Sequence, residues 1–294
     1  MLERLGINAK EAEKTLMVAS SEKKNQALKK IAEGLIENTD KIIEANKVDL
    51  ENGEKNGMAK SMLDRLKLDK ERIEGMAKGV LDVATLPEPV GRILSATERP
   101  NGLRIEKVST PIGVIAVIFE ARPNVTSDAA ALCLKSGNTV ILRGGKEAIN
   151  SNKTIAKVMR QAVKEAGMPE DVIQLVEDTS RESANELMKM NEYVDVLIPR
   201  GGAGLIQAVV KNATVPVIET GVGNCHIYID KNEKTKIHRI YFEGNNALTA
   251  RQLKKAMKKT NEKFSLFNDW KSSILEMFST NENFTTEEYE NDKK

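Results

Sequence analysis

Five short apolar runs, separated by helical segments, constrain the fold of this chain more than any other feature of the sequence. The runs cover residues 112–119, 139–142, 172–176, 194–198 and 215–218, and the helical segments cover 128–135, 150–166, 180–190 and 204–212. Continuous apolar runs are typical of parallel strands that are covered on both faces. Strands that alternate with helices of roughly ten or more residues predict right-handed crossovers. We therefore expect an α/β fold with a Rossmann-like, doubly wound parallel sheet.

The first 90 residues are predicted to be mostly helical. Apolar residues recur at helical spacing over residues 8–37, 40–50 and 61–85. Expected breaks and caps are Ser20-Ser21, Asn52-Gly53, Asn56-Gly57, and either Asp69 or Ser61. Two β-prone runs, 91–96 and 103–108, flank an Asn-Gly turn at 99–102 and predict a hairpin.

Charge and cysteine content exclude several classes of protein. The net charge is only +2, so no global field favours nucleic acid or an anionic membrane, and a small-molecule ligand is the better expectation. The two cysteines, Cys133 and Cys225, do not have metal-ligand spacing, and we expect no metal site. No apolar run approaches the roughly 18 residues of a membrane span, and no signal peptide is recognisable, so we expect a cytoplasmic protein.

Glycine-containing loops follow the second and fourth apolar runs, at the sheet edge where open α/β sheets bind ligands. The first offers backbone amides and a lysine for an adenosine ribose or its phosphate, and the second leads into a helix N-terminus that suits a pyrophosphate. The candidate cofactor-binding residues are Arg143, Gly144, Gly145, Lys146, Arg200, Gly201 and Gly202. Neither loop matches the dinucleotide fingerprint, so each one alone is better explained as an ordinary β-to-α turn.

The loop after the first apolar run carries the candidate substrate-binding residues Glu120, Arg122 and Asn124. Arg122 and Asn124 suit a carboxylate, a phosphate or a carbonyl oxygen, and Pro123 would hold the turn rigid. An exposed charged loop is the alternative. Glu219 is a possible cleft carboxylate, either as a general base or as a cofactor contact, and a structural role fits it equally well.

Neither cysteine is a good candidate nucleophile. Cys225 and His226 are adjacent in sequence, and adjacent residues on an extended strand point to opposite faces, so they should not pair. Cys133 lies in an apolar helical segment, where core packing is the expected role.

Taken together and in order, residues 118–138, 141–147, 198–204 and 219–226 resemble the gamma-glutamyl phosphate reductase family (glutamate-5-semialdehyde dehydrogenases) of the aldehyde dehydrogenase superfamily. The resemblance runs over about residues 5–231. It implies an aldehyde-dehydrogenase-like NADP-binding domain over residues 1–231, with a helical part at 1–90. It also implies NADPH-dependent reduction of L-glutamyl 5-phosphate, an acyl phosphate, to L-glutamate 5-semialdehyde in proline biosynthesis. The cofactor would lie against Lys146 and residues 200–202, and family members form homo-oligomers.

The sequence departs from this family after Cys225. The catalytic cysteine of the family lies beyond the segment that matches Cys225, and we find no counterpart for it or for the strand that would pair with the hairpin. We therefore expect a truncated chain that retains cofactor affinity and is inactive alone. The alternative is a non-catalytic NADPH-binding or interaction protein.

Residues 236–294 differ in character, with basic and aromatic residues in place of the earlier pattern. This tail resembles a partial POTRA repeat of an outer-membrane barrel assembly protein, which implies a small α+β module after a boundary at 231–236. We interpret the joining of the two parts as either a fusion or an assembly artefact that joins two truncated reading frames. A role in outer-membrane assembly is a further alternative, which the missing export signal disfavours.

Overall fold

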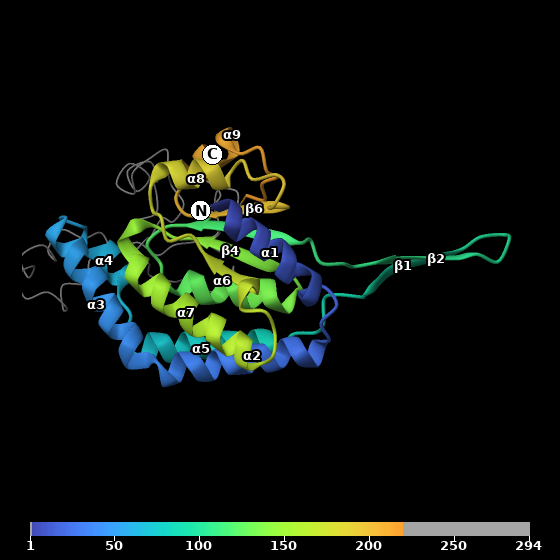
Figure 1. The fold of residues 1–294 in the computed structure, drawn as a ribbon, viewed down its shortest axis with the longest axis horizontal. Coiled ribbons are helices and arrows are strands. Elements are labelled where there is room, and N and C mark those ends of the chain that lie inside the picture. The colour runs from blue at the N-terminus through green and yellow to red at the C-terminus, as the bar shows by residue number, and fades with distance from the viewer. Residues whose placement is uncertain (1, 220–294) are drawn as a thin grey trace, which may run out of the picture. The chain divides into compact units, whose positions relative to one another are not determined.

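The computed structural model describes residues 2–219, and its parallel sheet lies between two layers of helices (Figure 1). The four strands of this sheet are β3 (Val114–Phe119), β4 (Thr139–Arg143), β5 (Ile173–Leu175) and β6 (Val196–Arg200). They are arranged in the order β5-β4-β3-β6, and every pair is parallel. The predicted doubly wound sheet is confirmed.

Helices of the second half connect these strands. They are α6 (Asn124–Lys135), the 3₁₀ turn Lys146–Ala148, α7 (Ile149–Glu165), the 3₁₀ turn Glu170–Val172, α8 (Arg181–Leu187) and α9 (Ala203–Asn212). The fifth predicted strand, residues 215–218, does not form a named strand within the described residues. It contributes a single parallel bridge, between Leu197 and Val217.

The two faces of the sheet pack into two separate cores because side chains alternate along each strand. Ile115, Val117 and Phe119 of β3 face the core that includes α2, α5, α6 and α7. Val114, Ala116 and Ile118 of the same strand face the core that includes α1, α8 and α9. All six are buried, which explains why the strand reads as one continuous apolar run.

Five helices precede the sheet, as the sequence predicts. They are α1 (Leu2–Leu16), α2 (Ser21–Glu37), α3 (Thr39–Lys55), α4 (Lys60–Leu66) and α5 (Lys70–Thr85). The break at Ser20 and the cap at Asp69 are confirmed, since each side chain accepts a hydrogen bond from the backbone N–H three residues on. Ser61 is not a cap, because it lies inside α4. The predicted break at Asn52-Gly53 is wrong, and α3 continues to a stop at Gly57, whose φ is +71°.

The predicted hairpin is confirmed and projects away from the sheet (Figure 1). Its strands β1 (Ile93–Glu98) and β2 (Arg104–Val108) pair in antiparallel register, with Ala96 opposite Glu106. Gly102 has a φ of +82°, which the tight turn between them requires. Every residue of both strands is exposed.

Two further expectations from the sequence concern membrane-spanning helices and the C-terminal tail. Among the described residues, no helix combines the length and apolar character needed to cross a membrane. The proposed boundary at 231–236 and the POTRA-like tail at 236–294 lie outside the described residues.

Candidate active site

The strand order creates a topological switch point between β3 and β6. From β3 the chain moves through β4 to β5 on one side, and it then crosses back to place β6 on the other side of β3. In open α/β sheets, ligands bind in the crevice outside the carboxyl ends of the strands at such a point. Residues 120–122 and 200–202 follow β3 and β6 directly, so two of the three predicted loops meet there.

Glu120 joins these two loops. Its backbone N–H donates to the carbonyl oxygen of Arg200 at 3.3 Å, and its carboxylate Oε2 accepts from the N–H of Gly202 at 3.1 Å. Gly202 is the N-cap of α9, so the carboxylate lies where the helix presents unpaired N–H groups. A Cβ at Gly201 would lie 2.7 Å from Cδ of Glu120 and 2.8 Å from Cδ2 of Leu205, so a larger residue there would require these side chains to move.

The third loop, residues 143–146, lies beside the first. A Cβ at Gly145 would lie 3.6 Å from the carbonyl carbon of Glu120 and 3.7 Å from the backbone nitrogen of Ala121. A Cβ at Gly144 would overlap Nδ2 of the buried Asn152 and come within 3.1 Å of the Phe119 ring. All three predicted loops therefore converge, and at Gly144 the absence of a side chain permits the close packing.

Arg143 is held within the protein. Its Nη2 donates to the carbonyl oxygens of Thr179 and Ser180, both at 2.8 Å, and so connects the end of β4 to the start of α8. Burial of the guanidinium lowers the pKa of Arg143 from its ordinary value. Lys146, by contrast, is exposed and makes no ion pair among residues 2–219. Of the two basic side chains in this loop, only Lys146 is available to a ligand.

The N-terminus of α7 is filled by a carboxylate from α3. Asp49, which is 2% exposed, accepts from the N–H of Asn150 at 3.2 Å and from the N–H of Ser151 at 2.8 Å. It also accepts from the side chains of these two residues, at 2.8 and 2.6 Å. This helix end therefore has no free site for a ligand anion, although it follows one of the predicted loops.

The other predicted residues are placed less centrally. Asn124 begins α6, and its Nδ2 donates to Oδ2 of Asp128 at 2.9 Å, one turn further along the same helix. Glu219 is exposed at the end of the described chain. Cys225 lies outside the described residues. Cys133 packs in the core, as predicted, and burial raises the pKa of its thiol to about 12.

A cavity of about 250 Å³ opens at the switch point. Its lining residues are Met62, Arg65, Glu120, Ala121, Arg122, Val125, Arg200, Gly201 and Gly202. Five of them are candidates from the sequence. Met62 and Arg65, on α4, were not predicted, and no local pattern marks them because α4 precedes β3 by almost fifty residues.

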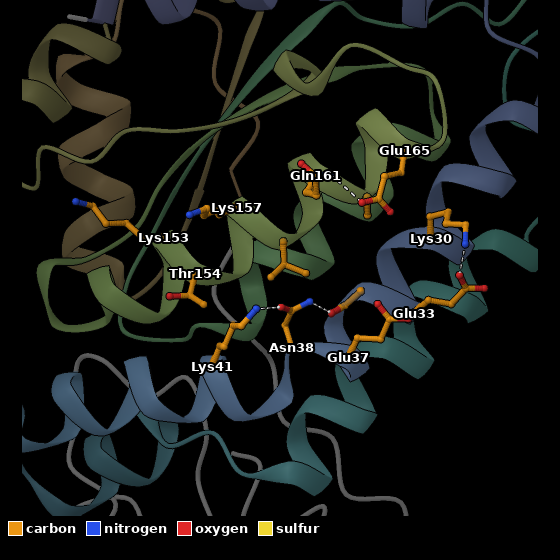
Figure 2. A pocket seen from close by; sticks show the side chains of 13 residues that line it. Lys30, Glu33, Glu37, Asn38, Lys41, Lys153, Thr154, Lys157, Gln161 and Glu165 are labelled. Carbon is orange, nitrogen blue, oxygen red and sulfur yellow. Dashed lines mark hydrogen bonds and ion pairs between the residues drawn. The ribbon is translucent and has the colours of Figure 1, made fainter.

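A larger cavity, of about 580 Å³, lies between α2 and α7 and contains none of the predicted site residues (Figure 2). Its charged side chains are largely matched with neighbours. Lys30 pairs with Glu33 at 2.7 Å, Gln161 donates to Glu165 at 2.8 Å, and Lys153 pairs with Glu177 at 2.6 Å. Size alone therefore does not identify the functional site. In the part of the chain that the structure describes, no group of three or more His, Cys, Asp or Glu side chains could hold a metal ion.

Comparisons with known proteins agree with this geometry. The model of the aldehyde dehydrogenase family matches residues 3–245. A gamma-glutamyl phosphate reductase of Clostridium botulinum (strain Alaska E43 / Type E3) is 60% identical over 232 residues, which are 79% of this chain and 56% of that protein. One from Heliobacterium modesticaldum is 60% identical over 225 residues, 76% of this chain and 54% of that protein.

Solved structures show the same relationship. The crystal structure of gamma-glutamyl phosphate reductase from Thermotoga maritima matches with a TM-score of 0.75 at 47% identity, over 76% of this chain and 54% of that one. The enzyme of the same name from Saccharomyces cerevisiae matches with a TM-score of 0.68 at 37% identity, over 73% of this chain and 55% of that one. The chain thus spans about half the length of the curated relatives it matches. The fold expected from the sequence is confirmed as that of these reductases, and the chain belongs to the aldehyde dehydrogenase family.

Proposed function

We propose that this chain carries the cofactor-binding part of an NADPH-dependent reductase that converts L-glutamyl 5-phosphate to L-glutamate 5-semialdehyde in proline biosynthesis. One observation carries the proposal: three loops, two of which contain glycine, converge at the switch point of the sheet, in a chain that is 60% identical over 232 residues to a protein named gamma-glutamyl phosphate reductase. The reaction is cytoplasmic in this proposal, and the substrate is a small acyl phosphate.

The cofactor pyrophosphate belongs at the N-terminus of α9. That helix end has no side-chain cap of its own, whereas the end of α7 is filled by Asp49. Residues 200–202 would then approach the phosphates through backbone N–H groups and the Arg200 guanidinium. Gly144 and Gly145 would give the cofactor room beside β4.

Preference for NADP over NAD is assigned to Lys146. Dinucleotide folds that use NAD carry a carboxylate near the end of the second strand to bind the ribose 2′-hydroxyl, and a basic residue there accommodates a 2′-phosphate. In this chain the end of β4 carries Arg143, and the loop after it carries the exposed Lys146. Because Arg143 is engaged with Thr179 and Ser180, Lys146 is the residue left for the phosphate.

Titration of NADPH and NADH into the chain, followed by cofactor fluorescence, tests this assignment. In Lys146→Ala, NADPH should bind about ten-fold more weakly and NADH almost unchanged, since one charge-assisted contact is lost. The exposed Lys78 of α5 provides a matched control, as Lys78→Ala removes the same charge elsewhere. Equal loss for both cofactors would contradict the assignment.

We do not propose any of the described residues as the nucleophile that would form a thioester with the substrate. Cys133 is buried and its pKa is raised to about 12, so it is not a nucleophile near neutral pH. The test is phosphate-dependent reduction of NADP with glutamate semialdehyde, carried out with the unmodified chain and with Cys225→Ala. No turnover in either protein is the expected result. Turnover that is lost in Cys225→Ala would make Cys225 the nucleophile and overturn this part of the proposal.

The hairpin is proposed as a contact with a second copy of the chain. An isolated two-stranded hairpin is marginal in water, and its unpaired edges are templates for another strand. Here exposed apolar side chains, Ile93, Leu94, Ile105 and Val108, lie on both strands. Sedimentation velocity should show self-association that Ile105→Lys reduces, and a strictly monomeric unmodified chain would contradict the proposal.

The boundary at 231–236 and the POTRA-like character of residues 236–294 stay predictions. The family match extends to residue 245, past that boundary. Limited proteolysis with mass spectrometry tests it directly. Cleavage concentrated at 231–236 would support two modules, and cleavage well after 245 would not.

A further inference from the structure

The cavity at the switch point is lined by three guanidinium groups and one carboxylate. Arg65 comes from α4, Arg122 from the loop after β3, and Arg200 from the end of β6. Three elements that are distant in sequence thus bring the same side chain to one concave surface. Glu120 is the single acidic residue of the lining.

The carboxylate of Glu120 is not paired with these arginines. Its Oε2 accepts from the N–H of Gly202, and no ion pair joins it to a lysine or arginine within the described residues. The acidic neighbour of Arg65 in sequence, Asp64, is taken by Arg72 at 2.9 Å. The positive charge of the cavity is therefore left for a ligand.

Arginine is the side chain best suited to bind an oxyanion, because its planar fork makes two parallel hydrogen bonds to a carboxylate or phosphate. Exposed arginines are common on protein surfaces. What distinguishes this set is its convergence on a cavity at the point where doubly wound sheets bind their ligands.

The size of the cavity limits the ligand. At about 250 Å³ it falls below the roughly 300–1,000 Å³ of pockets that enclose a drug-sized molecule, so it suits a small ligand or one end of a larger one. The apolar side chains of Met62 and Val125 form part of the wall. This lining fits a short aliphatic chain that ends in an anionic group.

We propose that Arg65 and Arg122 form an oxyanion pocket for the anionic end of the small substrate, beside Arg200, which the proposed function assigns to the cofactor phosphates. In this proposal Arg65 of the N-terminal helical region is a specificity-determining residue. The inference rests on the proposed function, since it assigns the substrate of the same site. A carboxylate and a phosphate share the required chemistry, and both occur on an acyl phosphate of an amino acid.

Calorimetric titration of the 294-residue chain with inorganic phosphate and, separately, with L-glutamate tests the pocket. We expect one or both anions to bind, and Arg65→Ala to weaken that binding about ten-fold through loss of a charge-assisted pair. Arg65→Lys should recover only part of the loss, because an ammonium does not reproduce the bidentate fork. Binding of phosphate alone would identify the phosphate end, and binding of glutamate alone the carboxylate end.

Arg4→Ala on α1 is the matched control, since Arg4 is also exposed and lies outside the cavity lining. It removes the same charge and should leave both titrations unchanged. Arg65 is exposed and donates no hydrogen bond among the described residues, so the melting temperature of Arg65→Ala should match that of the control. Equal affinities in Arg65→Ala and Arg4→Ala, or no binding of either anion to the unmodified chain, would overturn the pocket.

A parallel NADPH titration separates this inference from the proposed function. NADPH binding that survives in Arg65→Ala while anion binding is lost supports both. NADPH binding that falls together with anion binding would assign the pocket to the cofactor and overturn the substrate assignment. If NADPH does not bind the unmodified chain but phosphate binds through Arg65, the proposed function fails and the oxyanion pocket stands.

Discussion

The N-termini of α7 and α9 both follow a parallel strand and a glycine-containing loop, yet the protein treats them differently. The α7 end donates four hydrogen bonds to the two carboxylate oxygens of the buried Asp49. The α9 end donates one, from the N–H of its N-cap residue, to an exposed carboxylate on a neighbouring loop. A helix N-terminus in an α/β sheet is thus either closed by the protein or left accessible, and the loop sequence alone does not say which.

This difference predicts different roles for the two loops. At α7 the buried carboxylate connects α3 to the sheet layer, and Asn46 strengthens the connection by donating to Oγ of Ser151 at 3.0 Å. At α9 the exposed site can exchange one anion for another. We therefore expect substitutions at the α7 end to change stability and substitutions at the α9 end to change ligand affinity.

The largest effect is expected for Asp49→Ala. The substitution leaves the backbone N–H groups of Asn150 and the buried Ser151, with two side-chain donors, without an acceptor, so the free energy of unfolding should fall by about 3 kcal/mol. Urea unfolding followed by circular dichroism measures it. Glu51→Ala, on the exposed side of the same helix, should change stability by less than about 0.5 kcal/mol. Similar midpoints for the two variants would mean that the α7 end is not closed by Asp49.

A smaller loss of stability is expected for Gly144→Ala. The added methyl group would overlap Nδ2 of Asn152, whose Oδ1 accepts from the Thr126 hydroxyl at 3.0 Å, and it would crowd the Phe119 ring. Such overpacking typically costs about 1–3 kcal/mol.

Gly75→Ala is the control for this change. Gly75 lies inside α5 with no atom within 4 Å of the added Cβ, so alanine should stabilise the helix by about 0.5–1 kcal/mol. Thermal melts of the two variants should therefore shift in opposite directions. A shift in the same direction would show that the loop after β4 has room that the structure does not show.

The α9 end should respond through affinity. In Glu120→Gln the side chain keeps an oxygen for the Gly202 N–H but loses the negative charge that a cofactor pyrophosphate would meet there. Removal of about 0.3–1 kcal/mol of repulsion near a helix end should tighten NADPH binding by about two- to five-fold.

Salt provides the check on this prediction. Because the effect is electrostatic and the site is exposed, the gain in Glu120→Gln should shrink between 50 mM and 500 mM salt. Equal NADPH affinity in both proteins at low salt would contradict the exchange of anions at the α9 end.

These outcomes bear on how far the sequence could predict the structure. The buried strands and the caps at Ser20 and Asp69 were predictable, because apolar runs and capping side chains act within a few residues. The break predicted at Asn52-Gly53 failed for a tertiary reason. Gly53 is where α3 packs closely on its neighbours, since an added Cβ would lie 3.1 Å from Cδ2 of Leu63. Glycine there permits a contact between helices and does not end one.

The candidate site likewise has features that the local sequence predicts and features that only tertiary contacts determine. The three loops were predictable because parallel strands place their carboxyl ends at one edge. Asp49 and Arg65 were not, since each acts on an element far along the chain: Asp49 caps a helix 101 residues later. Contacts between residues so far apart leave no periodic or local pattern in the sequence. They nevertheless decide which helix N-terminus is capped by a carboxylate and which cavity is lined by arginines.

The smallest effect, a dependence on pH, is expected where the β4 loop meets α8. Hydrogen bonds from the backbone N–H and hydroxyl of Ser180 lower the pKa of Asp178 from its ordinary value, and the positive charge of Arg143 lowers it further. A carboxyl whose pKa is lower in the folded state stabilises the fold at pH values above the unfolded pKa of about 3.9. That contribution is lost as the pH falls through the lower, folded value. Melting temperatures of Asp178→Asn and the unmodified protein should therefore differ at pH 7, and the difference should shrink as the pH falls below about 3.9. A constant difference at every pH would show that the Asp178 charge contributes nothing to the loop that holds Arg143.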